Sequence, residues 1–91
     1  MKHFVVKAMI FKILRERGRT VGTEIETRNG IADVIDVDNL IVYEVETKIT
    51  KKRVEEKTRQ FKNFRDLFVF NANKFSNDLN LLEKKLQDLI V

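Results

Sequence analysis

The 91-residue chain has no cysteine, one histidine and three glycines. The absence of cysteine excludes disulfides, thiolate zinc sites and cysteine nucleophiles, and it favours an intracellular protein. The one histidine, His3, excludes a histidine-rich metal site and argues against a Ser/His/Asp triad. A glycine-rich phosphate loop is absent too, which argues against nucleotide-dependent chemistry.

Long hydrophobic runs are also missing. The most apolar stretch, MKHFVVKAMIFKIL at the N-terminus, is interrupted by Lys7 and Lys12, and no small-residue cleavage site follows it. It is too short to span a bilayer. We therefore expect a cytoplasmic protein without a membrane anchor.

Charge is distributed unevenly along the chain. The net charge of +4 divides into +5 for residues 1–20, −6 for 21–47, +6 for 48–65 and −1 for 66–91. Ordinary solvated surfaces explain any single charged run. An acidic centre between two basic segments is better explained by a metal site that handles a polyanion, with the basic segments neutralising phosphates.

Hydrophobic periodicity predicts one α/β domain over residues 1–91, with the order αβββαβα. Asn29-Gly30 indicates a hairpin, and the continuous apolar run LFVF indicates a strand covered on both faces. The expected sheet is a three-stranded antiparallel meander plus a strand added by a parallel crossover, with helices on both faces. The expected helices are 4–17, 50–64 and a last one capped by Ser76, Asn77 or Asp78; the expected strands are 20–27, 31–37, 40–47 and 67–70.

Two helices predict self-association. The first helix is apolar on nearly every side, so it is deeply buried or shared with a second subunit. In the last helix, Leu79, Leu82, Leu86 and Leu89 fall on one face. A chain of this length has a thin core, and we expect a homodimer.

Carboxylates recur within the strands of the predicted meander. A two-residue turn at Asn29-Gly30 would place Glu26 directly opposite Asp33. A second such turn at Asp38-Asn39 would place Asp33 opposite Glu44. Directly opposed residues share one face of a sheet, so the sequence predicts a row of three carboxylates across three strands.

Such a row needs a partner, because opposed like charges destabilise a sheet by about 0.2–1 kcal/mol per pair. Mg²⁺ is a suitable partner, since it binds through one or two carboxylates together with phosphate oxygens. Solvation or pairing with Lys and Arg is the alternative. It explains Asp36 and Asp38, which sit at a turn, and leaves Glu24 undecided. The row predicts a metal site for Mg²⁺ or Mn²⁺.

The segments GIADVI and IVYEVETK, set on an αβββαβ order, resemble the PD-(D/E)xK nuclease superfamily with its restriction-endonuclease-like fold. The chain is similar in particular to archaeal Holliday-junction resolvases and small archaeal viral nucleases. The likeness to the core fold extends from the first helix through DLFVF, and the motif itself runs from Gly30 to Lys48. It implies a metal-dependent endonuclease acting on DNA rather than RNA, structured or junction DNA included.

The resemblance also implies roles for individual residues. Asp33 matches the metal-binding Asp of the family's second core strand, and Glu44 matches the acidic residue of the third. Glu46 stands where the family usually has its lysine, an arrangement similar to the Glu-x-Glu of some restriction enzymes. Lys48, or Lys57 from the following helix, would supply the missing positive charge.

A further departure from the family lies in the first helix. Resolvase-like members often have a glutamate there, whereas VVKAMIFKIL has none, and Glu26 would substitute as a metal ligand. Lys57 also has a simpler explanation, because a lysine beside an apolar stripe is more often a surface residue that buries only its stem.

The helix over 50–64 supports a phosphate partner independently of the resemblance. Lys51, Lys52 and Arg53 lie in its first turn, where the helix dipole disfavours cations by about 0.3–1 kcal/mol each. A nearby phosphate would turn this cost into binding, and Lys57 would extend the same nucleic-acid-binding surface.

Two other functions fit the same residues. One is a catalytically inactive nuclease fold that binds nucleic acid, for which Glu46 in place of lysine argues. The other is an assembly module that uses the apolar first helix and the leucine stripe. Dependence on a divalent metal separates these from an enzyme, which would use Asp33, Glu44, Glu46 and Lys48.

Overall fold

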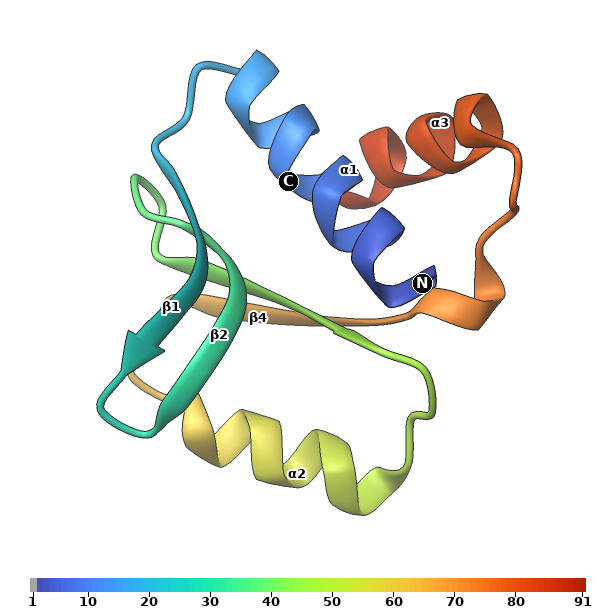
Figure 1. The fold of residues 1–91 in the computed structure, drawn as a ribbon. Coiled ribbons are helices and arrows are strands. Elements are labelled where there is room, and N and C mark those ends of the chain that lie inside the picture. Colours follow the sequence, from blue (N-terminus) through green and yellow to red (C-terminus); the bar gives the residue numbers. More distant parts are fainter. Residues whose placement is uncertain (1) are drawn as a thin grey trace.

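The computed structural model describes residues 2–91 (Figure 1). The elements follow the order α-β-β-β-α-β-α, as the sequence predicts. They are α1 (Lys2–Glu16), β1 (Val21–Thr27), β2 (Gly30–Asp36), β3 (Ile41–Glu46), α2 (Lys51–Gln60), β4 (Asp66–Asn71), a short 3₁₀ helix (Ala72–Lys74) and α3 (Leu79–Leu89).

The strands form one mixed sheet in the order β1-β2-β3-β4. β1, β2 and β3 are an antiparallel meander, and β4 runs parallel to β3. A parallel pair needs a crossover connection, and α2 supplies it. α2 covers one face of the sheet, while α1 and α3 lie together over the other (Figure 1). The sheet topology and the presence of helices on both faces confirm the expected architecture.

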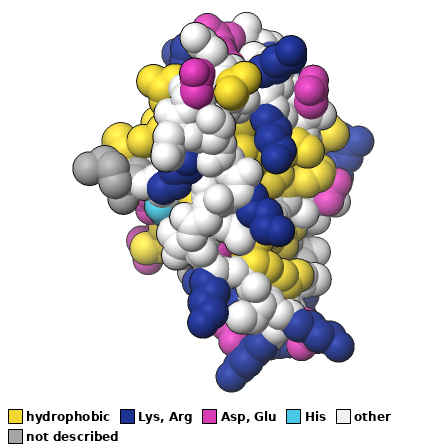
Figure 2. All heavy atoms as spheres, turned by 90° about the vertical axis from the view of Figure 1, so that its right-hand side faces the viewer, with side chains coloured by type: hydrophobic (Ala, Val, Ile, Leu, Met, Phe, Trp, Pro, Cys, Tyr) yellow, Lys and Arg dark blue, Asp and Glu magenta, His cyan; other side chains and the backbone are white. Residues whose placement is uncertain are grey.

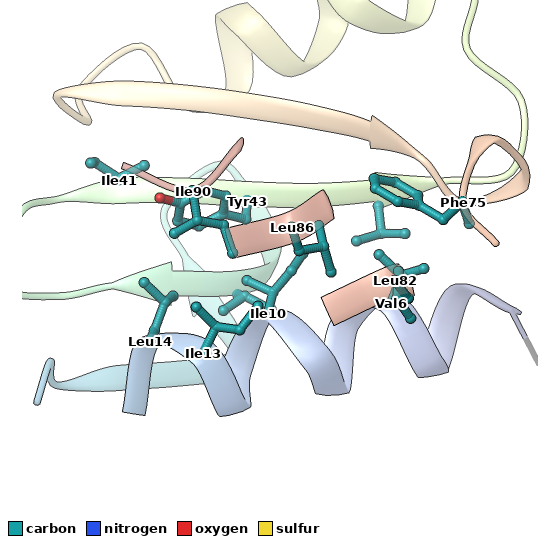
Figure 3. Packing of buried hydrophobic residues seen from close by; sticks show 13 residues of the cluster. Val6, Ile10, Ile13, Leu14, Ile41, Tyr43, Phe75, Leu82, Leu86 and Ile90 are labelled. Atoms are coloured by element: carbon teal, nitrogen blue, oxygen red, sulfur yellow. The ribbon is translucent and has the colours of Figure 1, made fainter. Parts of the chain in front are cut away.

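The main core lies between the sheet and the α1–α3 layer (Figure 3). Tyr43 of β3 is fully buried there and stacks on Phe68 of β4 with ring centroids 5.4 Å apart. From the helices, Ile10 and Leu86 reach the same core. A smaller cluster between the sheet and α2 contains Ala32, Ile35, Val42 and Phe61. The sheet therefore has an apolar layer on each face.

The two helices of the α1–α3 layer are less completely buried than the sequence predicts. In α3 the buried side chains are Leu82 and Leu86, and Ile90 just after the helix is buried too; Leu79 and Leu89 are exposed, so only the middle of the expected leucine stripe is buried. Leu82 and Leu86 are four residues apart, which keeps them on one side of the helix. On α1, Phe4 remains 66% exposed. None of the helices within residues 2–91 is long and apolar enough to cross a membrane.

The first hairpin is shifted by two residues from the predicted register. Thr27 pairs with Gly30 and Glu26 with Ile31, so the turn is Arg28-Asn29 and not Asn29-Gly30. Gly30 has φ +141° and its backbone lies against the Gln60 side chain of α2, where a Cβ would overlap the amide. Its glycine serves this close approach rather than the turn. The predicted opposition of Glu26 and Asp33 is therefore wrong.

The second hairpin has the predicted register, with Ile35 paired to Val42. Asp36, at the end of β2, was expected to be solvated or paired with Lys or Arg; it is paired with Arg19 and completely buried. Its carboxylate accepts hydrogen bonds from Arg19 Nη1 at 2.9 Å and from Asn39 Nδ2 at 3.0 Å. Asp36 thus fixes the turn and the entry into β1 as part of a buried ion pair.

Candidate active site

The ladder between β2 and β3 is replaced by side-chain bonds at Asp33 and Glu44. Backbone pairing runs from Asp36↔Ile41 to Val34↔Tyr43. At the next position the Asp33 amide donates to Glu44 Oε2 at 2.6 Å, and the Val45 amide donates to Asp33 Oδ2 at 2.9 Å. Each carboxylate is held by a backbone amide of the opposite strand. This reciprocal arrangement fixes both side chains next to each other in the middle of the sheet.

Glu44 is buried and paired with a lysine from α2. The Lys57 ammonium lies 2.6 Å from Glu44 Oε1, and the two side chains are only 10% and 1% exposed. Burial raises the pKa of Glu44, while the Asp33 amide and the Lys57 ammonium lower it. Lys57 is therefore not the surface residue that its place beside an apolar stripe suggested. It is the counter-ion of the central carboxylate.

Asp33 faces a histidine and a lysine from α1. His3 Nε2 lies 3.6 Å from Asp33 Oδ2, and Lys7 Nζ lies 3.8 Å from Asp33 Oδ1. Lys7 also forms an ion pair with Glu24 of β1. His3 and Lys7 are four residues apart, so they project from the same side of the helix, toward the sheet. Asp33 and Glu44 are thus approached by cations from opposite faces of the sheet.

The remaining predicted residues lie at or beyond the end of β3. Glu46 accepts a hydrogen bond from Arg53 Nε at 2.7 Å. Lys48 follows the strand and is exposed. Lys51 and Lys52 are exposed in the first turn of α2, whose N-cap is Thr50. The expected cluster of three cations is thus divided, because Arg53 also lies near Glu56 and is engaged within the protein.

The row of three carboxylates does not form. Glu26 lies opposite Ile31 on the exposed edge strand β1, away from its expected partner Asp33. The repulsion that argued for a metal is offset within the protein, since Asp33, Glu44 and Glu46 each lie beside a cation. Within residues 2–91, no three His, Asp or Glu side chains converge to hold a metal ion.

The pair of Asp33 and Glu44 nevertheless fits one kind of metal. Mg²⁺ keeps several waters and is commonly held by one or two carboxylates plus substrate phosphates, so two adjacent carboxylates suffice. They do not make a closed site such as structural zinc requires. Both carboxylates are oriented before any ion arrives, because backbone amides hold them.

Sequence reasoning missed two residues of the site, His3 and Lys7. A signal for them was present: both are polar, stand one turn apart, and flank the apolar residues 4–6 of the first helix. What the sequence lacks is the orientation of the helix across β2, which depends on tertiary packing.

Comparisons of the chain with models of protein families, with curated proteins and with solved structures found no match. The likeness to PD-(D/E)xK nucleases therefore stays a prediction from the motif residues of the sequence.

Proposed function

We propose that the protein is a metal-dependent nuclease that hydrolyses phosphodiester bonds in DNA, with Mg²⁺ or Mn²⁺ as cofactor. The observation that supports this most is the constellation of Asp33, Glu44 and Lys57 around a local break in the sheet. Two oriented carboxylates and a desolvated lysine are the parts that metal-assisted phosphoryl chemistry needs.

The burial of Glu44 and Lys57 supports a functional role rather than a purely structural one. A buried ion pair usually adds little to stability compared with apolar residues of the same size. Here the buried ion pair lies beside Asp33. At this point of the sheet, side-chain hydrogen bonds to the carboxylates replace the regular backbone hydrogen bonds between β2 and β3. Ionisable groups arranged in this way concentrate at functional sites.

Asp33 and Glu44 would hold the metal ion, and the two amides that fix them would keep them oriented. When bound, the ion supplies a water of lowered pKa and neutralises charge that develops on the phosphate. Lys57 favours the ionised form of Glu44, since its ammonium opposes the effect of burial on the pKa of that carboxyl. Because Lys57 lies beside Glu44, it would supply the positive charge that was otherwise expected from Lys48. Glu46 would orient Arg53.

Basic side chains around α2 would position the polyanion. Lys51 and Lys52 are exposed there, and Lys48 precedes them. Figure 2 views the molecule from the right-hand side of Figure 1, and dark blue Lys and Arg side chains gather at its lower end, where α2 lies. Such contacts neutralise phosphates without reading the bases.

The experiment is incubation with plasmid, single-stranded and four-way-junction DNA and with RNA, in Mg²⁺, Mn²⁺ or chelator. The proposal expects cleavage that chelator abolishes. The Asp33→Asn and Glu44→Gln variants should lose cleavage, and Asp88→Asn, an exposed carboxylate on α3, should retain it.

A second candidate is an inactive nuclease fold that binds nucleic acid or serves as an assembly module. The pairing of Asp33, Glu44 and Glu46 with protein cations favours it, because such a site is electrostatically complete without a metal. Binding of DNA that persists in chelator, without cleavage in any metal, would select this candidate over the enzyme.

A further inference from the structure

Lys7 is shared between two carboxylates at the edge of the site. Its side chain is only 13% exposed, although it is a lysine on a surface helix. The ammonium pairs with Glu24 of β1 and lies 3.8 Å from Asp33 Oδ1. Glu24, which the sequence leaves undecided, is therefore paired with a lysine.

The backbone at Glu24 is distorted in a way that allows this contact. Glu24 has φ +49°, in the left-handed region that a glutamate rarely adopts. The β1–β2 ladder pairs Ile25 with Ala32 and Thr23 with Val34 but skips the position between them, where Glu24 and Asp33 lie. Such a conformation costs about 1–3 kcal/mol and persists where surrounding contacts impose it, often at functional sites.

Lys7 would oppose a divalent cation at Asp33. Two positive charges within a few ångströms repel each other even in a partly hydrated site, so the ammonium and the metal compete for the same carboxylate. Glu24 favours metal binding at Asp33, because it attracts the Lys7 ammonium away from that carboxylate. A groove of about 260 Å³ between α1 and β1, lined in part by Lys7, Phe11 and Glu24, leaves room for the lysine to move.

We propose that Lys7 is an internal counter-cation that sets the affinity of the Asp33 site for divalent metal, and that Glu24 acts on this affinity only through Lys7. The inference rests on the proposed function, since it concerns the same metal. It makes Lys7 a positioning residue that stabilises the metal-free protein and weakens metal binding.

Three variants test the proposal. Lys7→Met should bind Mn²⁺ about tenfold more tightly and should melt at a lower temperature without metal. Glu24→Gln should bind Mn²⁺ about threefold to tenfold more weakly, because the lysine then pairs with Asp33 alone. In the Lys7→Met background, Glu24→Gln should have no further effect, as expected if the two residues act through one interaction.

The measurements are Mn²⁺ affinity, from electron paramagnetic resonance of the free ion and from calorimetry, and melting curves with and without Mn²⁺. Lys12→Met is the matched control, because Lys12 is on the same helix but pairs with Glu16 and Glu83. Lys7→Gln serves the same purpose as Lys7→Met if the latter does not fold.

If the wild-type protein binds Mn²⁺ and both Lys7 variants bind it with the same affinity as wild type, this inference is overturned and the proposed function stays intact. Glu24→Gln that weakens binding equally with and without Lys7 would identify Glu24 as a direct ligand and would also overturn it. Wild-type protein that binds no Mn²⁺ would overturn both the inference and the proposed function.

Discussion

Replacing Lys57 by Met would leave the buried carboxylate of Glu44 without its counter-ion. Surface ion pairs contribute about 0–1 kcal/mol, but these side chains are buried, so the relevant range is that for a broken buried pair, about 3–5 kcal/mol. A domain of this length has a total stability of about 5–14 kcal/mol. The loss corresponds to a decrease in melting temperature of at least about 12 °C.

The effect should depend on pH, and its sign follows from Glu44. Burial raises the pKa of Glu44 in the folded protein, so its contribution to stability is full below the unfolded value of 4.5 and is lost as pH rises through the folded value. Without Lys57 the folded pKa is higher still. The stability difference between wild type and Lys57→Met should therefore be greatest near neutral pH and shrink as the pH falls and Glu44 of the variant takes up a proton.

Thermal melting followed by circular dichroism between about pH 5 and pH 8 measures this difference. Lys84→Met on α3 is the control for loss of a lysine, because Lys84 is exposed. Adding Glu44→Gln to Lys57→Met should restore much of the stability at neutral pH, since no buried charge remains. A Lys57→Met variant that melts within about 3 °C of wild type, or whose deficit is the same at both ends of the pH range, would refute the reasoning.

Three further predictions follow from the fold and the surface. Asp36→Ala should lower stability by about 3–5 kcal/mol in chemical denaturation, because it leaves Arg19 without its buried partner; a loss below about 1 kcal/mol would contradict this. Lys51→Ala with Lys52→Ala should reduce the slope of log affinity for DNA against log salt by about 2, and an unchanged slope would show that neither contacts phosphate. Light scattering should give the mass of a dimer at micromolar concentration, and Phe4→Glu should produce monomers; a wild-type monomer would contradict the dimer.

The sequence was sufficient for the fold because local signals agree with one another. The apolar periodicity gives the element order, and the run LFVF marks the strand covered on both faces. The β2–β3 register was also predictable, which is why Asp33 and Glu44 are neighbours as expected.

The predictions from sequence fail where tertiary contacts determine the position of a turn or the burial of a side chain. Asn29-Gly30 is the usual signal of a tight turn, yet Gly30 is required by the close approach of Gln60. The turn is Arg28-Asn29 instead, and Glu26 is therefore not opposite Asp33. Pairing of Asp36 with a Lys or Arg was expected, but its burial was not, because that depends on Arg19 reaching it from the α1–β1 connection. Lys57 could not be distinguished from a surface lysine until the position of α2 over Glu44 was known.

The most direct test of the proposed nuclease is cleavage of the DNA substrates by wild type, Asp33→Asn and Glu44→Gln in Mg²⁺ or Mn²⁺, with melting curves that confirm folding. The account predicts cleavage by wild type that chelator abolishes, and at least about a hundredfold loss in both folded variants, as expected when a group that stabilises the transition state is removed. Folded variants that cleave like wild type, or a wild type that cleaves no substrate in either metal, would contradict it.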